Sequence, residues 1–325
     1  MGGRRELGRL FVDRANALSV TVDNVPPTAT FTASSPIDEG SSSTLSFTAA
    51  SDPSAADTIA GFHYSFACDG LDASLASTYA TAGTASSTTC SFADNGSYTV
   101  KGRIFDRDNG STTYSATVVV SNVAPTVFGP ADQSSNEGTP KFFDLGSFSD
   151  PGVNDNPWVV DVDWGDASSS NFSMATQGTI TAQSHTYADG PNDYTITVMV
   201  TDKDGDSDSK TFSVHVNNVA PTATLANNGP VNEGSPATVS FSNQFDPSST
   251  DTAAGFHYAF SCTNGVLPTT YAAAGSSPST TCTFADNGSY TVSGRIFDKD
   301  DGYTTYTTTV VVNNRSEERR VGKEC

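Results

Sequence analysis

The chain has 325 residues, of which 36% are hydrophobic, and a formal net charge of −20. Such an acidic chain would repel phosphate backbones, which argues against nucleic acid as a partner. No segment approaches the ~18 consecutive apolar residues of a membrane-spanning helix, and residues 1–20 lack the apolar stretch of a signal peptide.

The signature Asn-Val-x-Pro marks a repeat of nearly one hundred residues. It begins at Asn24, Asn122 and Asn218, which are 98 and 96 residues apart. A fixed period of this length indicates one small domain repeated in tandem. The predicted divisions are a remnant of a preceding repeat (1–24), three repeats (25–122, 123–218 and 219–314) and a charged tail (315–325).

The first element in chain order is a predicted strand over residues 18–25. Its pattern matches that of Phe212–Val219, the last strand of the second repeat. A final strand without the rest of its sandwich should be poorly packed. We therefore expect the chain to be a fragment of a larger surface protein that begins within an array.

Each repeat then carries strands with alternating apolar residues. In the first repeat Phe62, Tyr64, Phe66 and Cys68 alternate with His63, Ser65 and Ala67. Because side chains alternate faces along a strand, the first set is predicted to face a core and the second to face solvent. The matching inward sets are Val160, Val162 and Trp164 in the second repeat, and Phe256, Tyr258, Phe260 and Cys262 in the third.

Two further strands close each repeat. The inward rows of the first of these strands are Tyr98, Val100, Gly102 and Ile104, then Tyr194, Ile196, Val198 and Val200, then Tyr290, Val292, Gly294 and Ile296. Exposed aromatic rows would support sugar binding, but the outward positions are mostly Thr, Ser, His and Arg; Phe105 and Phe297 are the exceptions, outward by alternation unless a loop covers them. Short strands with turn signals every ~8–12 residues predict an all-β chain of three tandem β-sandwiches. The joints are short, so we expect a semi-rigid arrangement of the domains.

Four of the five cysteines form two equivalent pairs. Cys68 and Cys90 are 22 residues apart in the first repeat, and Cys262 and Cys282 are 20 apart in the third. A pair that recurs with its repeat indicates a disulfide within each domain, and therefore an oxidising compartment. The competing interpretation is metal ligation, although neither pair has the tight Cys-x-x-Cys spacing of a zinc site.

The second repeat resembles the polycystic-kidney-disease (PKD) repeat over most of residues 123–218. The residues that carry the resemblance are Val162–Asp166 with Trp-Gly-Asp, Ser184–Tyr187 with His-x-Tyr, Asp193–Val198 with Tyr-x-Ile-x-Val, and Val200–Gly205 with Val-x-Asp-x-x-Gly. The other two repeats depart from this pattern. Phe66 and Phe260 replace Trp164, Cys90 and Cys282 replace His185, and Cys68 and Cys262 replace Asp166.

The resemblance implies immunoglobulin-like sandwiches on a secreted or cell-surface bacterial protein. Such domains act as spacers or mediate protein or carbohydrate contacts, so the predicted function is a non-catalytic spacer or adhesion array. The alternative is an accessory binding arm of a secreted hydrolase whose catalytic domain lies outside this sequence. The expected partners are an extracellular protein or a polysaccharide.

Acidic residues gather at the turn before the last strand of each repeat. Calcium prefers six to eight oxygen ligands, and clustered carboxylates on a tight loop supply several of them. The alternative interpretation is an ordinary turn rich in Asp and Gly. No cofactor is required by the sequence, and calcium is the one candidate ligand. Its candidate ligating residues are Asp106, Asp108, Asp202, Asp204, Asp206, Asp298 and Asp300.

The sequence carries no recognisable catalytic motif, neither Gly-x-Ser-x-Gly nor His-Glu-x-x-His nor a phosphate-binding loop. His63, His257 and His215 are predicted to face outward, and His185 is predicted to have a packing or hydrogen-bonding role. We therefore predict that the chain is not an enzyme. The tail over residues 315–325 resembles a translated sequencing adapter and is left out of the predicted fold; the alternative is a natural charged tail.

Overall fold

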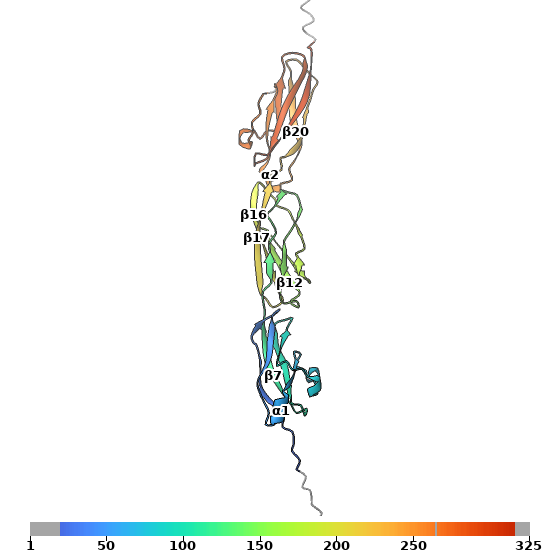
Figure 1. The fold of residues 1–325 in the computed structure, drawn as a ribbon. Coiled ribbons are helices and arrows are strands. Elements are labelled where there is room, and N and C mark those ends of the chain that lie inside the picture. Colours follow the sequence, from blue (N-terminus) through green and yellow to red (C-terminus); the bar gives the residue numbers. More distant parts are fainter. Residues whose placement is uncertain (1–19, 264, 316–325) are drawn as a thin grey trace, which may run out of the picture. The chain divides into compact units, whose positions relative to one another are not determined.

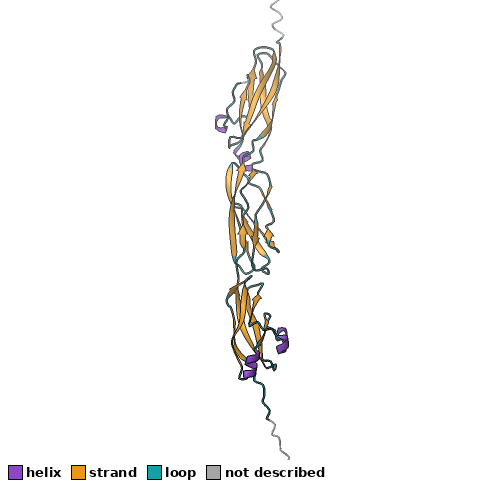
Figure 2. Cartoon of the chain, in the orientation of Figure 1, coloured by secondary structure: helices purple, strands orange, loops and turns teal. Residues whose placement is uncertain are grey.

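The computed structural model describes residues 20–263 and 265–315, and most of its ordered elements are β-strands (Figures 1 and 2). The described residues divide into two compact units, one up to Asn122 and the other from Val123. The first unit contains one β-sandwich, the first sandwich, and the second unit contains two, the second and third sandwiches. Among the described residues, no helix combines the length and apolarity needed to cross a membrane.

The first sandwich has seven strands in two sheets. Its elements are β1 (Thr28–Ala33), β2 (Ile37–Asp38), β3 (Ser42–Ser51), α1 (Ala55–Ala60), β4 (His63–Ala67), β5 (Ser87–Ser91), β6 (Gly96–Phe105) and β7 (Ser111–Ser121), with 3₁₀ turns at Asp72–Ser74 and Tyr79–Thr81. One sheet has the order β1-β3-β5 and the other β2-β7-β6-β4. Fully buried Leu45, Val100 and Val118 lie in the core between them. Two packed, mainly antiparallel sheets of this order form an immunoglobulin-like sandwich.

The third sandwich repeats this plan. Its elements are β18 (Thr222–Asn227), β19 (Val231–Asn232), β20 (Pro236–Phe245), α2 (Ser249–Ala254), β21 (His257–Ser261), β22 (Ser279–Thr283), β23 (Gly288–Phe297) and β24 (Tyr303–Asn313), with a 3₁₀ turn at Tyr271–Ala273. The sheets have the orders β18-β20-β22 and β19-β24-β23-β21. Its buried apolar residues form two clusters, one around Val239 and Val292 and one around Phe241 and Ile296.

The second sandwich has more and shorter strands. They are β8 (Thr126–Phe128), β9 (Gln133–Asn136), β10 (Lys141–Phe143), β11 (Ser147–Ser149), β12 (Trp158–Asp163), β13 (Ser169–Met174), β14 (Gly178–Thr179), β15 (Gln183–His185), β16 (Asn192–Thr201) and β17 (Ser207–Asn217). The largest sheet has the order β13-β12-β16-β17-β9. Trp158, Trp164 and Tyr187 belong to a single buried core cluster.

The inward rows predicted from alternation are confirmed along the long strands. Val160 and Val162 are fully buried, and Trp164 is 1% exposed. In the first sandwich the rings of Tyr64 and Phe66 both pack on Phe47, with centroids 5.4 and 5.6 Å away. The prediction that Cys68 faces inward is wrong, because β4 ends at Ala67 and Cys68 lies exposed in the following turn.

The outward predictions for Ala67, Phe105 and Phe297 are also wrong, since these side chains are at most 2% exposed. The segment between β4 and β5 covers the outer face of the sheet. Tyr79 of this segment stacks on His63 at 3.7 Å, and His63 is the register partner of Phe105. The third sandwich has the same arrangement, with Tyr271 stacked on His257 at 3.7 Å. Phe105 and Phe297 are therefore core residues and offer no surface to a sugar.

The predicted strand over residues 18–25 has no strand pairing in its described part. Val20 and Val22 are 80% and 87% exposed, as expected for a poorly packed segment. Residues 1–19 and the adapter-like residues 316–325 lie outside the described residues. The limits of the remnant and of the individual repeats stay predictions.

Candidate functional site

The most concentrated polar chemistry of the second unit lies where the second sandwich meets the third, near α2 (Figure 1). The third sandwich contributes three buried carboxylates. Asp246 directly follows β20, Asp251 lies in the first turn of α2, and Asp298 directly follows β23. They are 5%, 0% and 0% exposed, respectively. Carboxylates as buried as these require charged or hydrogen-bonding partners.

Local backbone geometry orients each of the three. The Ser248 amide donates to Asp246 Oδ1 at 2.8 Å, and Ser248 Oγ in turn accepts from the Asp251 amide at 3.1 Å, capping α2. Asp298 Oδ1 accepts from the amides of Asp300 and Gly302 at 2.9 and 2.8 Å. Short polar side chains at turns and helix starts bind nearby amides in this way. One oxygen of Asp246 and one of Asp298 is thus held by the backbone.

The second sandwich contributes Glu137 and Asp189 to the same region. Glu137 is fully buried, and its two carboxylate oxygens accept from the amides of Val219 and Gly190, each at 2.7 Å. Val219 belongs to the Asn-Val-x-Pro joint, so Glu137 ties the joint to its own sandwich. A Cβ on Gly138 would lie 2.0 Å from the Pro247 carbonyl oxygen, so glycine permits a close approach between the two sandwiches.

Lys299 is the cation of this region. Its Nζ lies 2.7 Å from Asp189 Oδ1 and 3.1 Å from Asp251 Oδ1, and it also pairs with Asp300. Burial acts to lower the pKa of Lys299, but hydrogen bonds to Asp189, Asp300 and Asp251 outweigh it and raise that pKa above its usual value. Lys299 therefore stays charged and bridges the second and third sandwiches.

One ammonium does not neutralise this many carboxylates. Burial raises the pKa of Asp251 to about 6 and that of Glu137 to about 7, and nearby aspartates add to both shifts. Burial likewise raises the pKa of Asp246 and of Asp298. Desolvation and like-charge repulsion both disfavour the ionised form. The region is therefore under-supplied with positive charge.

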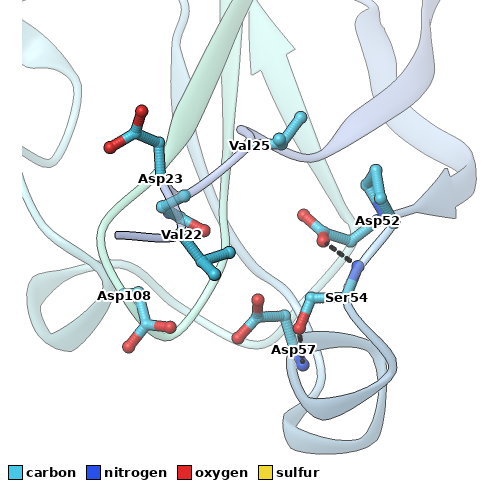
Figure 3. A pocket seen from close by; sticks show the side chains of 9 residues that line it. Val22, Asp23, Val25, Asp52, Ser54, Asp57 and Asp108 are labelled. Carbon is cyan, nitrogen blue, oxygen red and sulfur yellow. Dashed lines mark hydrogen bonds between the residues drawn. The ribbon is translucent and has the colours of Figure 1, made fainter. Parts of the chain in front are cut away.

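The first sandwich carries a matching set at its own end, where it borders a pocket of about 510 Å³. The pocket is lined by Val22, Asp23, Asn24, Val25, Asp52, Pro53, Ser54, Asp57 and Asp108. In Figure 3 the carboxylates of Asp52, Asp57 and Asp108 turn toward the same hollow. Arg107 Nε pairs with Asp57 Oδ1 at 3.1 Å, as Lys299 pairs with Asp251.

The second sandwich has the same set with one difference. Asp155 is fully buried and pairs with Lys203 Nζ at 3.1 Å. Asp202 Oδ1 accepts from three amides of its turn. Asp150, the counterpart of Asp246, accepts a 2.7 Å hydrogen bond from the indole of Trp158. In this copy a buried tryptophan supplies a partner for the first aspartate.

The turn acids predicted from the sequence therefore have two kinds of surroundings. Asp106, Asp202 and Asp298 are buried and hold their turns by accepting backbone amides, which supports the turn interpretation. Asp300 pairs with Lys299, and Asp108 and Asp204 lie within 4 Å of the equivalent basic residues. Asp206 is exposed. Calcium binding at these residues stays a prediction.

Sequence reasoning missed several residues of this region. The acids before and within the short helices were not singled out, although they recur with the repeat as Asp52, Asp150 and Asp246 and as Asp57, Asp155 and Asp251. A glutamate that precedes a glycine recurs in the same way as Glu39, Glu137 and Glu233, and it was not singled out either. The signal was the period of each acid, which equals the period of the Asn-Val-x-Pro joint.

The structure joins Cys68 to Cys90 and Cys262 to Cys282, as predicted, with Cα atoms 5.6 Å apart in each pair. At the matching place of the second sandwich, His185 Nε2 lies 2.8 Å from Asp166 Oδ2, and the His185 ring stacks on Trp164 with centroids 4.6 Å apart. Ser168 donates to the same aspartate. The aspartate stands between serine and histidine, so this group lacks the serine–histidine contact of a hydrolase triad.

The chain matches no protein-family model, and no curated protein matches it. Among solved structures it is similar to Drosophila N-cadherin EC1-4, with 16% identity over 90% of this chain and 76% of that chain and a TM-score of 0.31. The human desmocollin-1 ectodomain gives 16% identity over 93% and 60%, with a TM-score of 0.25. The Bacteroides ovatus mixed-linkage glucan utilization locus protein SGBP-B gives 16% over 90% and 71%, with a TM-score of 0.24. At these TM-scores the likenesses support no functional conclusion.

Proposed function

We propose that the chain is a non-catalytic extracellular spacer or adhesion array of PKD-type immunoglobulin-like domains. The observation that carries the proposal is the polar network at the joint of the second and third sandwiches. Glu137 accepts from the joint at Val219, Ser248 Oγ donates to the Ala188 carbonyl at 2.9 Å, and Lys299 pairs with Asp189. A joint fixed by several directional contacts transmits orientation between domains, which is what a spacer requires.

Burial makes these contacts effective. Glu137 is fully buried and Lys299 is about three-quarters buried, so solvent screens their interactions less than those of surface ion pairs. Removing one partner would leave the other buried without its hydrogen bonds, at a cost of ~1–3 kcal/mol. The second and third sandwiches are therefore inferred to keep one mutual orientation in solution.

The extracellular setting is supported by the two disulfides, since such bonds persist in oxidising compartments. The PKD assignment is supported by the buried Trp164, the His185–Asp166 pair and the buried Tyr187, which are the residues that carry the sequence resemblance. The proposed partners are an extracellular protein or a polysaccharide. Phe142 and Phe245 are 72% and 64% exposed and offer aromatic faces for such contacts.

The stiffness of the joint is tested by energy transfer between one dye in the second sandwich and one in the third, in the full chain. We expect a narrow distance distribution for the natural sequence and a broad one for Glu137→Ala. Glu233→Ala is the matched control, because Glu233 is the equivalent glutamate of the third sandwich and accepts from the Arg315 amide. A broad distribution in the natural sequence would overturn the spacer role.

The hydrolase-arm alternative is tested by retention on insoluble polysaccharides. Retention that is lost in Phe142→Ala or Phe245→Ala would favour a carbohydrate-binding arm. Turnover of a polysaccharide by the purified chain would contradict both versions of the proposal.

A further inference from the structure

Two overlapping groups of three carboxylates lie at the joint of the second and third sandwiches. One consists of Glu137, Asp189 and Asp251, and the other of Asp246, Asp251 and Asp298. Within each group the facing carboxylate oxygens lie within 4.8 Å of one another. Such spacing lets a single cation contact all three members of a group.

The two groups differ in how many of their carboxylates form a salt bridge with Lys299. Lys299 Nζ contacts Asp189 and Asp251, so the first group has an ammonium ion of its own. Within the described residues, no salt bridge joins Asp246 or Asp298 to a basic side chain. Asp246 and Asp298 are therefore buried negative charges that form no salt bridge among the described residues, and Lys299 reaches the second group through Asp251.

Unpartnered oxygens point to a missing ligand in the second group. Asp246 and Asp251 are at least 95% buried, yet Oδ2 of each accepts no hydrogen bond. The joint residue Asn218 donates from Nδ2 to Asp298 Oδ2 at 3.1 Å, and its buried Oδ1 also lacks a donor. Buried oxygens normally accept a hydrogen bond, because a buried oxygen without one carries the full desolvation penalty.

We propose that Asp246, Asp251 and Asp298, with Oδ1 of Asn218, form a binding site for one calcium ion. All the donors are oxygens, which suits a hard cation, and the absence of nitrogen and sulfur donors in this group disfavours zinc. Carboxylates can bind calcium through one oxygen or both, and water completes six to eight ligands. Magnesium requires a stricter octahedron and retains its waters, which a group this buried accommodates less well.

The ion would connect the joint to the third sandwich. Asn218 belongs to the Asn-Val-x-Pro joint, while the three aspartates come from the ends of β20 and β23 and from α2. Asp251 would then contact the ion through Oδ2 and Lys299 through Oδ1, so the two cations share one carboxylate. Calcium at this site is expected to order the joint and to leave the Lys299 bridge in place.

The site is tested by titrating calcium chloride into the chelator-treated full chain in a calorimeter, with magnesium chloride as the comparison. The first sandwich carries matching residues, so the total number of ions bound does not by itself identify this site. Asp246→Asn and Asp251→Asn are each expected to remove one bound ion or to weaken its binding by about tenfold or more. Asp286→Asn is the matched control, since Asp286 is exposed and lies outside both groups.

Two measurements separate loss of the site from loss of the fold. At Asp246, which forms no salt bridge among the described residues, asparagine removes a repelling charge and keeps the shape, so Asp246→Asn should melt at or above the natural chain's temperature in chelator. Asp251→Asn also weakens the pair with Lys299, so its calcium response is compared with its own melting temperature in chelator. Saturating calcium at ten times Kd should raise the melting temperature of the natural chain by about 3–6 °C, and that of the two variants by less. Hydrogen exchange of the peptide that contains Asn218 should slow with calcium only where Asp246 and Asp251 are intact.

Three outcomes would overturn the proposal. They are no calcium-dependent heat or exchange in the natural chain, an equal response in Asp251→Asn, and an equal response to magnesium. Loss of stability in Lys299→Met without any calcium response in the natural chain would show that the lysine is the only cation the joint uses. None of these outcomes depends on whether the array acts as a spacer.

Discussion

The second sandwich and its neighbours close the same point of the fold with different chemistry. In the first and third sandwiches, Cys68–Cys90 and Cys262–Cys282 join the end of one strand to another covalently. In the second, His185 and Asp166 meet through a 2.8 Å hydrogen bond, and the histidine ring stacks on Trp164. One architectural position thus accepts either a covalent bond or a polar pair attached to a large aromatic side chain.

The apolar cores also differ between the second sandwich, which has the His185–Asp166 pair, and the two sandwiches that have a disulfide. Trp164 belongs to one continuous buried cluster in the second sandwich, and this cluster also contains Val198 of β16. In the first sandwich Gly102 stands where Val198 stands, because the rings of Phe31 and Phe47 occupy the space above it. The buried residues of the third sandwich form two clusters instead of one. The disulfide of the third sandwich therefore lies in a domain with a divided core, whereas the buried residues around Leu45 and Cys90 in the first sandwich form one cluster.

The largest expected effect is on the second sandwich. Trp164→Ala should cost about 3–5 kcal/mol, since it removes a large side chain that is 1% exposed and packs on Phe143 and His185. Urea unfolding followed by the fluorescence of Trp158 measures the loss. Phe142→Ala, at an exposed site of the same sandwich, should stay within about 0.5 kcal/mol. Equal effects of the two changes would contradict the role given to Trp164.

Removal of a disulfide should act on the other two sandwiches. Reductant, or the double change Cys262→Ala and Cys282→Ala, should cost the third sandwich about 3 kcal/mol, the value expected for closing a loop of this size. Both tryptophans lie in the second sandwich, so tryptophan fluorescence reports that domain while circular dichroism reports all three. The comparison fails if reductant shifts the tryptophan-detected transition as far as the transition detected by circular dichroism.

A substitution at Gly102 tests whether the rings of Phe31 and Phe47 require a residue without a side chain at this position. A Cβ at Gly102 would lie 2.6 Å from a Phe31 ring atom and 2.7 Å from Phe47. Gly102→Ala should therefore cost about 1–3 kcal/mol through overpacking, measured by thermal unfolding. Gly83→Ala is the control, because its Cβ would meet only one atom, at 3.9 Å. A neutral Gly102→Ala would show that the rings yield easily.

The His185–Asp166 pair should have a smaller but specific effect. His185→Ala should cost about 1–3 kcal/mol, because it removes a hydrogen bond to a charged group that is largely buried. His215→Ala removes a similar pair with Asp193 at 2.7 Å, but both side chains are more than half exposed, so less than about 0.5 kcal/mol is expected. Similar losses in the two variants would refute the importance of burial.

The pH dependence of the free energy of unfolding tests whether the hydrogen bonds to Asp166 stabilise the folded state. Burial acts to raise the pKa of Asp166, but hydrogen bonds from Ser168 and His185 outweigh it and hold that pKa below 3.8. A lowered pKa in the folded state contributes stability that is fully present above pH 3.8 and is lost as the pH falls through the folded value. The tryptophan-detected free energy of unfolding should therefore fall more steeply with acid in the natural chain than in Asp166→Asn. Parallel curves would contradict this assignment.

Much of the fold was predictable because its determinants are local. The alternation of Val160, Val162 and Trp164 and the inward rows of the long strands follow from the two-residue period of a strand, which needs no tertiary information. The predictions for Ala67, Cys68 and Phe105 were wrong because alternation along a strand does not by itself determine which side chains are buried. A strand that ends early places the next residue in a turn, and a loop that folds back can bury an outward face.

The candidate site was less predictable, because its members come from distant parts of the chain. Asp298 and Asp300 were singled out by their turn, whereas Asp246, Asp251 and Glu137 gave no local signal beyond recurring with the repeat. The fold of the third sandwich brings Asp246, Asp251 and Asp298 together, and the packing of the second sandwich against the third adds Glu137. A buried carboxylate without a donor cannot be recognised from a sequence, since burial is a property of the packed chain.

The sequence by itself determined the repeat period, the all-β class and the pairing of the cysteines, because each depends on spacing along the chain. Only the tertiary structure decided which residues share the joint. Packing brings Glu137 and Asp189 of the second sandwich beside Asp251 and Lys299 of the third, and leaves Asp246 and Asp251 with buried, unpartnered oxygens. Electrostatic interactions depend on distance and burial in three dimensions, and therefore on how the domains meet.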